Sequence, residues 1–358
     1  MHKKLFIPGP TEVREDILQA QAKWMIGHRS KDFGALNESI VNRLKQILYT
    51  EKYTYVFTSS GTGVMEGSIR NCVKDSILHC INGAFSDRWA KISEACGKQV
   101  DRIEVPWGKA IKPEMIEEKL KAKKYEAVAF CHNETSTGVR APIREIGEML
   151  KRYPEVISLV DAVSSLGGDL LKLDELGVDV TITSSQKAFA LPPGLAIAVV
   201  SQKAMDKTRA NPGRGYYFDF DAMQKRYEKD HQHPTTPAVS LFFALDVELG
   251  KMLAEGMEQR YQRHVAMAEF TRAWVKKYFK LFPETGYESV TLTTADNKNS
   301  RNIKVADLNS ELGKRGFQIS NGYGKLKEET FRIAHMGELT LDEIKELLTN
   351  IEDILKLK

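Results

Sequence analysis

Runs of apolar residues alternate with segments of helical period through the first half of the sequence. Seven such runs are rich in β-branched residues and have the length of a strand, at residues 53–58, 76–81, 100–105, 127–131, 156–160, 178–183 and 195–200. Between several of them, residues 86–95, 113–122 and 144–152 space their apolar positions as amphipathic helices do. Strands that alternate with helices predict an α/β fold around a mostly parallel, seven-stranded sheet.

The pattern changes after Pro237. Residues 238–253 and 259–279 have long helical patterns with no apolar run between them. A shorter alternation of strands and helices resumes near residue 289 and ends in a helix at 341–357. We therefore expect a large α/β domain over residues 1–253, followed by a smaller C-terminal α/β domain over residues 254–358 that is entered through a long helix.

Composition and charge exclude several classes of protein. The 358 residues are 42% hydrophobic and 28% charged, as in an ordinary globular protein, and the net charge of +4 is small and interspersed, so we expect no nucleic-acid partner. No apolar run is long enough to span a membrane, and the one at residues 5–7 is too short for a signal peptide. Four cysteines at wide spacings contain no CxxC motif, which favours a reducing, cytoplasmic location.

One lysine stands where a lysine is unexpected. Lys187 lies in the short turn between the apolar runs 178–183 and 195–200, both of which we expect to be buried. Lysine is rarely buried, because placing its charge in the interior is costly. Either Lys187 extends to water, or its amine is used inside the protein for chemistry.

Other polar groups follow neighbouring strands of the predicted sheet. Asp161 follows the run 156–160, and the segment 132–138 follows the run 127–131. A glycine loop, Ser60-Gly61-Thr62-Gly63, follows the run 53–58 and leads into a helix, a combination that binds phosphate. Ligands bind beyond the carboxyl ends of parallel strands, so these groups gather at one edge of the sheet. A lysine, an acid and a phosphate loop together meet the needs of pyridoxal phosphate.

Three other chemistries are less well supported. The glycine loop could indicate a nicotinamide dehydrogenase, but its third glycine, Gly67, stands one position late and the next strand ends without an acid for a ribose. We expect no metal site, because His132 and the pair His231 and His233 have no third ligand at a suitable spacing. Ser136 lies near His132, but no GxSxG motif accompanies it, so a hydrolase is not indicated.

The sequence resembles the class V aminotransferases, the group that contains alanine–glyoxylate and serine–pyruvate aminotransferases within the fold-type I pyridoxal-phosphate enzymes. The resemblance covers nearly the whole chain and rests on nine short motifs in the family's order. They are Pro8-Gly9-Pro10-Thr11, Gly27-His28-Arg29-Ser30, Ser60-Gly61-Thr62-Gly63, Asn82-Gly83-Ala84-Phe85, the segment 134–139, the segment 160–165, Ser185-Gln186-Lys187-Ala188, Thr235-Thr236-Pro237-Ala238 and the segment 331–337.

The resemblance implies a role for each matching position around the cofactor. Lys187 would form the Schiff base and act as the general base, and Asp161 would hold the pyridinium nitrogen. Phe85, where many relatives have tryptophan, would stack on one ring face with Val163 against the other. The remaining contacts would come from Ser136 on the ring hydroxyl or the substrate, and from Thr62, Gly63, Gln186 and the backbone of Val64 on the phosphate.

The resemblance also implies contacts to the substrate and to a second subunit. Arg332 would clamp the α-carboxylate of the substrate, with the backbone of Gly9 closing over it. Thr235 matches a residue that reaches the phosphate of the neighbouring subunit, which implies a homodimer with shared active sites. Relatives often have tyrosine where this chain has Gln232, which puts a second such contact in doubt.

The expected function is transfer of an amino group from alanine or serine to glyoxylate or pyruvate. In the related phosphoserine aminotransferases, a His-Arg pair near the N-terminus binds the side-chain anion of the substrate. If Arg29 points into the pocket, an acidic donor (phosphoserine, aspartate or glutamate) becomes the better choice. A lyase of the desulfurase type is disfavoured because all four cysteines precede residue 132. The presence of Lys187, Asp161 and Arg332 argues against a non-catalytic binding protein.

Overall fold

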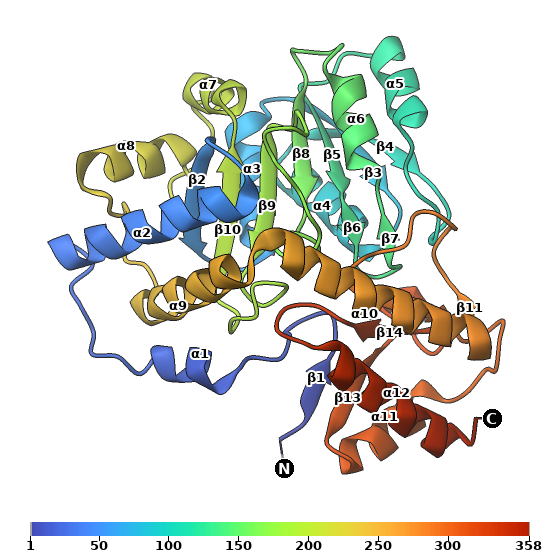
Figure 1. Cartoon of the computed structure of the whole chain (residues 1–358). Helices are drawn as coiled ribbons and strands as arrows, with labels where there is room; N and C mark the ends of the chain where they lie inside the picture. Colours follow the sequence, from blue (N-terminus) through green and yellow to red (C-terminus); the bar gives the residue numbers. More distant parts are fainter. Residues whose placement is uncertain (1, 358) are drawn as a thin grey trace.

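A seven-stranded sheet forms the centre of the larger part of the molecule (Figure 1). The computed structural model describes residues 2–357. In spatial order the strands are β2 (Tyr53–Thr58), β10 (Leu195–Val200), β9 (Val180–Ser184), β8 (Ile157–Asp161), β5 (Ala127–Cys131), β3 (Ser76–Ile81) and β4 (Gln99–Glu104). All neighbouring pairs are parallel except the two that involve β10. The mostly parallel, seven-stranded sheet expected from the sequence is therefore confirmed.

Helices cover both faces of this sheet, which explains why its strands are apolar on both sides. One face is covered by α2 (Lys31–Leu48), α5 (Pro113–Ala122), α6 (Ile143–Leu150) and α9 (Val239–Glu255), and α1 (Glu15–Ala20) packs on α9. The other face packs against α3 (Gly61–Cys72), α4 (Ala84–Ala95), α7 (Gln202–Ala210) and α8 (Phe220–Asp230). Successive residues of β5 alternate between the two cores: Val128 and Phe130 enter the first, Ala127 and Ala129 the second.

A second sheet of five strands belongs to the smaller part of the molecule. Its order is β1 (Lys4–Phe6), β13 (Phe317–Asn321), β14 (Thr330–Ala334), β12 (Leu292–Asp296) and β11 (Lys280–Leu281). It packs with α11 (Val305–Lys314), α12 (Leu341–Leu355) and the long helix α10 (Met257–Tyr278) around a separate core. A hairpin, β6 (Asn133–Glu134) with β7 (Val139–Arg140), and a short 3-10 helix, Gly324–Leu326, complete the structure.

The N-terminal strand was not anticipated. β1 pairs in parallel with β13, so residues near the start of the sequence complete the sheet that the C-terminal residues build. The division of the chain at residues 253 and 254 remains a prediction, although α9 ends at Glu255 and Gly256 separates it from α10. The other bounds agree with the sequence pattern to within about two residues, as is usual for element ends. None of the helices within residues 2–357 is both long and apolar enough to cross a bilayer.

Candidate active site

Lys187 lies in the loop between β9 and β10, at the carboxyl edge of the parallel strands. Its half-buried side chain donates a hydrogen bond from Nζ to the carbonyl oxygen of Pro8. Gly9 has a φ of +135°, and a Cβ atom there would lie 2.6 Å from Nζ, so only glycine allows this approach. Burial lowers the pKa of Lys187 to about 8, with the charge of Arg332 acting in the same direction. The fraction of uncharged amine near neutral pH is therefore far larger than for an ordinary lysine, about a tenth at pH 7.

Asp161 ends β8, and its side chain is 4% exposed. One carboxylate oxygen accepts the backbone N–H of Val163 at 2.8 Å, and the other accepts the thiol of Cys131 at 3.4 Å. Burial raises the pKa of Asp161 to about 6 despite these bonds. A buried acid in this state gains stability from a cationic partner, which matches the role expected of it towards a pyridinium.

A cavity of about 110 Å³ joins these groups to the start of α3. Ser60 precedes α3 and makes no side-chain cap, so the first backbone N–H groups of the helix remain available to an anion. The buried oxygens Ser184 Oγ and Gln186 Oε1 have no hydrogen-bond partner in the described structure. The cavity is lined by Ser60, Gly61, Thr62, Met65, Phe85, Arg88, Thr135, Asp161, Val163, Ser184, Gln186 and Lys187.

Six of the residues expected at the cofactor line this cavity: Thr62, Phe85, Asp161, Val163, Gln186 and Lys187. Gly63 lies in the first turn of α3, half-buried, and the side chain of Val64 is buried in the core beneath that helix. Neither is part of the cavity wall. Their contribution to a phosphate site stays a prediction that involves backbone groups only.

Ser136 is engaged elsewhere in this structure. Its hydroxyl donates to Glu134 at 2.7 Å and accepts the backbone N–H of Ala84 at 3.0 Å. Glu134 is fully buried and also accepts the N–H groups of Phe85 and Ser86 at 3.1 and 2.9 Å. Ser136 therefore holds the start of α4 in place, and its neighbour Thr135 lines the cavity instead.

Arg332 projects from β14 of the smaller sheet and is 6% exposed. Its guanidinium donates to the carbonyl oxygens of Thr135 at 3.2 Å and Asn321 at 3.0 Å. It forms no ion pair with a carboxylate among residues 2–357. Burial lowers the pKa of Arg332 to about 10, so it stays charged at neutral pH. A buried cation without a counterion creates a binding site for an anion.

Arg29 and Thr235 lie outside the cavity. The exposed Arg29 donates to the carbonyl oxygens of His233 and Pro234, the latter at 2.8 Å. Thr235 follows directly in the same segment, and Thr236 lies 3.4 Å from His28. Arg29 thus fixes the segment that carries Thr235 and does not enter the pocket of its own chain.

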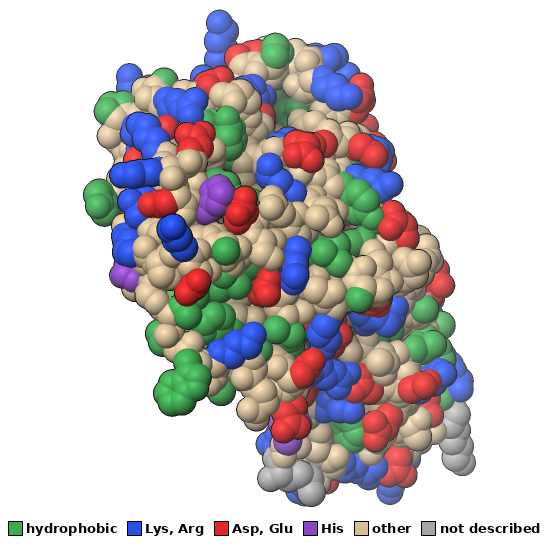
Figure 2. Space-filling view, turned by 60° about the vertical axis from the view of Figure 1, so that its left-hand side comes forward, with side chains coloured by type: hydrophobic (Ala, Val, Ile, Leu, Met, Phe, Trp, Pro, Cys, Tyr) green, Lys and Arg blue, Asp and Glu red, His purple; other side chains and the backbone are tan. Residues whose placement is uncertain are grey.

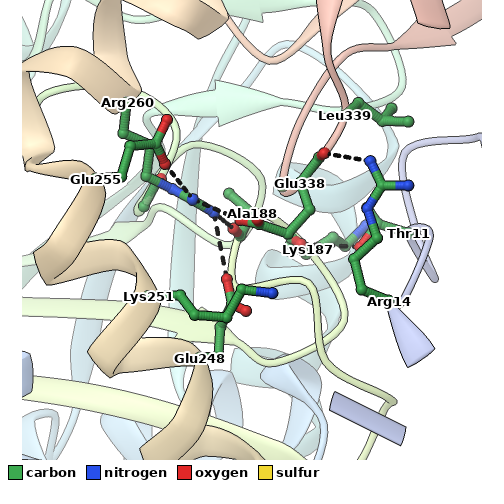
Figure 3. Close-up of polar contacts among 12 residues, drawn as sticks. Thr11, Arg14, Lys187, Ala188, Glu248, Lys251, Glu255, Arg260, Glu338 and Leu339 are labelled. Atoms are coloured by element: carbon green, nitrogen blue, oxygen red, sulfur yellow. Dashed lines mark hydrogen bonds and ion pairs between the residues drawn. The ribbon is translucent and has the colours of Figure 1, made fainter. Parts of the chain in front are cut away.

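A cluster of buried charges supports the Lys187 loop from behind (Figure 3). Arg260, on α10, is fully buried and donates to the carbonyl oxygen of Ala188 at 2.8 Å. The same guanidinium binds Glu338, just beyond β14, at 2.6 Å and Glu255 at 2.9 Å. It therefore connects the residue after Lys187 to the loop that follows the strand of Arg332. Burial raises the pKa of the neighbouring Glu248 to about 9, which keeps that acid protonated.

The sequence analysis gave no role to Met65, Arg88, Thr135 and Ser184, which line the cavity, or to Tyr323 beside it. Thr135 directly precedes Ser136, and Ser184 directly precedes the motif Ser185-Gln186-Lys187-Ala188. Arg88 stands three positions after Phe85 on α4, a spacing that places both side chains on one helix face and could have revealed it. Tyr323 comes from a loop of the smaller sheet and lies 5.1 Å from Phe85 between ring centroids. No local pattern signals that contact.

The fold and the site together define a class of enzyme. The family model described as aminotransferase class-V matches residues 13–326. An uncharacterized aminotransferase of Methanocaldococcus jannaschii is 40% identical over 99% of this chain and 93% of the relative. The chain therefore belongs to the class V aminotransferases, a family of pyridoxal-phosphate enzymes of fold type I.

Relatives with a named reaction are similar over almost the same length. An L-aspartate–glyoxylate aminotransferase of Paracoccus denitrificans is 34% identical over 94% of this chain and 87% of its own. A serine–glyoxylate aminotransferase of Methylorubrum extorquens is 34% identical over 94% and 86%, respectively. The crystal structure of an alanine–glyoxylate aminotransferase from Nostoc sp. superimposes with a TM-score of 0.93 at 28% identity, covering 99% of this chain and 96% of the other.

Proposed function

We propose that this aminotransferase moves the amino group of alanine or serine to glyoxylate or pyruvate, with pyridoxal phosphate attached at Lys187. The observation that carries the proposal is the buried, unpaired Arg332 beside a lysine whose pKa is lowered to about 8. The first group would bind a carboxylate, and the second loses its proton more readily than an ordinary lysine. Every amino acid and 2-oxo acid in such a reaction carries one carboxylate for Arg332.

The residues of the cavity fit the proposed cofactor. The start of α3 offers backbone N–H groups to a phosphate, and the unpartnered oxygen of Gln186 lies on the same wall. Phe85 and Val163 supply apolar surface, and Asp161 supplies a buried carboxylate. When bound, pyridoxal phosphate provides the electron sink that stabilises negative charge at the α-carbon of the substrate.

The chain's own groups then bind the substrate and move the proton. Arg332 would hold the α-carboxylate through the two guanidinium N–H groups that backbone carbonyls leave free. That contact would orient the α-C–H bond towards Nζ of Lys187, whose unprotonated form would accept the proton while the electron pair stays on the substrate. A base with a pKa near the working pH is the most effective for such a transfer. Asp161 would stabilise positive charge on the ring nitrogen throughout.

We choose a small donor because Arg29 does not supply the cavity with a cation for a second anionic group. Arg29, which would have favoured a second anionic group, is bound to backbone carbonyls outside the cavity. A second candidate is an acidic donor, because a relative at 34% identity is named an aspartate–glyoxylate aminotransferase and because Arg88 adds a cation to the cavity wall. That cation is already engaged by Tyr323 at 2.8 Å, so we favour the small donor.

The proposed working unit is a homodimer in which each active site is built from both subunits. Its proposed location is the cytoplasm. Thr235 has no contact with the cavity of its own chain, as expected of a residue that serves the neighbouring site. Three hydrophobic side chains in one N-terminal segment are exposed, Leu18, Trp24 and Met25, and Trp24 is 95% exposed. The four cysteines are free thiols, which supports a reducing compartment.

A donor screen tests the reaction. Alanine, serine, aspartate, glutamate and phosphoserine are each offered with glyoxylate, pyruvate or 2-oxoglutarate, and kcat/KM is compared. We expect alanine or serine with glyoxylate or pyruvate to be preferred. A preference for a dianionic donor would replace this proposal with the second candidate.

The attachment site is tested separately from the donor. Borohydride reduction of the holoenzyme followed by peptide mapping should place the reduced cofactor on Lys187. Lys187→Arg should abolish the adduct, and Lys74→Arg, at an exposed lysine, serves as the matched control. An adduct on a different lysine would refute the assignment.

A further inference from the structure

Tyr323 connects two guanidinium groups at the cavity. It lies on the loop between β13 and the 3-10 helix, and it is half-buried. Its hydroxyl accepts a hydrogen bond from Arg88 at 2.8 Å, and the guanidinium carbon of Arg332 lies 5.6 Å from its ring centroid. The ring also packs on Phe85, with centroids 5.1 Å apart. One side chain of the smaller sheet therefore contacts the proposed cofactor wall and both cations.

Arg88 is a cation of the cavity wall whose partners are an aromatic ring and a hydroxyl group. Its guanidinium lies 4.8 Å from the centroid of the Phe85 ring, and it forms no ion pair with a carboxylate within residues 2–357. Among the described residues, the hydroxyl of Tyr323 is the one side-chain group that accepts a hydrogen bond from Arg88. A neutral hydroxyl satisfies only part of what a guanidinium can bind, because five N–H groups are available. The hydroxyl binds Nη2 of Arg88, a nitrogen that a bidentate carboxylate would also use, so the hydroxyl and a carboxylate compete for this guanidinium.

The two cations together match a molecule with two carboxylates. Arg332 is placed for the α-carboxylate, and Arg88 stands across Phe85 and Tyr323 from it. A second carboxylate on the donor, as in aspartate, would be complementary to Arg88 in charge, and the planar guanidinium suits a carboxylate. The ring of Tyr323 packs on both Phe85 and Arg332, so it fills the space through which such a side chain would pass.

We propose that Tyr323 sets the donor preference of the enzyme by occupying Arg88 and excluding a second carboxylate. This inference rests on the proposed function and deepens it. The hydroxyl engages the cation, and the ring limits the size of the side chain that the pocket accepts. Discrimination of this kind is effective because a partly buried cation that gains or loses a charged hydrogen-bond partner changes binding, whereas apolar contacts alone discriminate weakly.

Two variants separate the hydroxyl from the ring. Tyr323→Phe removes the bond to Arg88 and keeps the packing on Phe85, and Tyr323→Ala removes both. We expect the ratio of kcat/KM for aspartate to that for alanine to rise about tenfold in Tyr323→Phe and further in Tyr323→Ala. The double variant Tyr323→Phe with Arg88→Gln should lose the gain, because the cation that receives the second carboxylate is absent.

Binding of unreactive carboxylates provides a readout that does not depend on turnover. Calorimetry on the holoenzyme compares succinate, which has two carboxylates, with propionate, which has one. Tyr323→Phe should tighten succinate about tenfold and leave propionate within about twofold. Tyr216→Phe, at a tyrosine that is 82% exposed, is the matched control and should change neither ligand.

The outcomes distinguish this inference from the proposed function. If wild type transaminates alanine or serine and the Tyr323 variants change both donors and both ligands equally, Tyr323 is only structural and the inference is overturned. If wild type already prefers aspartate, the proposed donor is wrong, and the calorimetry still decides whether Tyr323 restrains Arg88. A selective gain for succinate that needs Arg88 supports the inference.

Discussion

Burial of the Asp161 carboxylate lowers the free energy of unfolding of the cofactor-free protein at neutral pH. The pKa of this carboxyl group in the folded chain is raised from 3.8 to about 6, mainly by burial, so between these values the folded state binds more protons than the unfolded state. The stability that this group contributes is therefore present below about pH 4 and is lost as the pH rises through 6. A cationic ring nitrogen beside Asp161 would offset the loss of stability that comes from burying the ionised carboxylate. Cofactor binding should therefore stabilise the fold through Asp161.

Replacing Asp161 by asparagine should separate the two effects. At pH 7 we expect the cofactor-free Asp161→Asn protein to be more stable than wild type by about 2 kcal/mol, because no buried charge remains. Urea unfolding at pH 7 and at pH 4.5 measures this, and the advantage should shrink at the lower pH. Turnover of the loaded variant should fall at least about a hundredfold. A variant with wild-type turnover would show that Asp161 is only a cap for Val163.

At the scale of elements, α4 begins without a capping side chain of its own. Gly83 precedes it, and the buried Glu134 of the β6–β7 hairpin accepts the N–H groups of Phe85 and Ser86 instead. A Cβ atom at Gly83 would lie 2.3 Å from Cγ of Glu134 and 2.5 Å from the hydroxyl of Ser136. The helix that carries Phe85 and Arg88 is therefore positioned by a contact that only glycine permits.

Gly83→Ala should destabilise the protein and weaken cofactor binding together. We expect a loss of about 2–3 kcal/mol, because Glu134 must move and the start of α4 loses its acceptor. Urea unfolding and titration with pyridoxal phosphate measure the two effects. Gly27→Ala is the control, since no atom lies within 4 Å of the Cβ position there and stability should be unchanged. Equal behaviour of the two variants would contradict this account of α4.

The elements that could be predicted from the sequence are those with a strong period. The seven strands of the large sheet and its helices follow from apolar runs and amphipathic spacing, because burial dictates residue type there. The strand β1 has only three residues, and its partner β13 is remote in sequence, so no local pattern could reveal it. Among the expected site residues, those at the carboxyl end of a parallel strand or just beyond it, such as Asp161, line the cavity. Tyr323 could not be found, because its place depends on how the smaller sheet meets α4.

On the scale of the whole molecule, the surface near the N-terminal segment supports the proposed dimer. The side of the molecule that carries α1 and α2 is turned forward in Figure 2, where hydrophobic side chains gather towards the lower left among interspersed charges. Exposed hydrophobic groups in one patch mark surfaces that associate with a partner. Arg29 and Thr235 belong to segments that contact each other, so this region could carry Thr235 to a neighbouring site.

Mixing two inactive subunits tests whether the sites are shared. Lys187→Ala removes the attachment lysine, and Thr235→Ala removes the proposed phosphate contact, so each homodimer should be impaired at low cofactor concentration. A heterodimer of the two has one site with both lesions and one with neither. Random mixing should restore about a quarter of wild-type activity. No recovery, in subunits shown to exchange, would mean that both residues serve the same chain's site.

The pairing of β1 with β13 sets an order of events during synthesis. The residues of β1 leave the ribosome long before those of β13, although the two strands form one edge of a sheet. Pro8 and Gly9, which contact Lys187, lie between β1 and Thr11, and Thr11 is bound directly to the Lys187 loop. The segment that covers the lysine can therefore be held at one end as soon as the large sheet has folded, and at both ends only when the last part of the chain has been made.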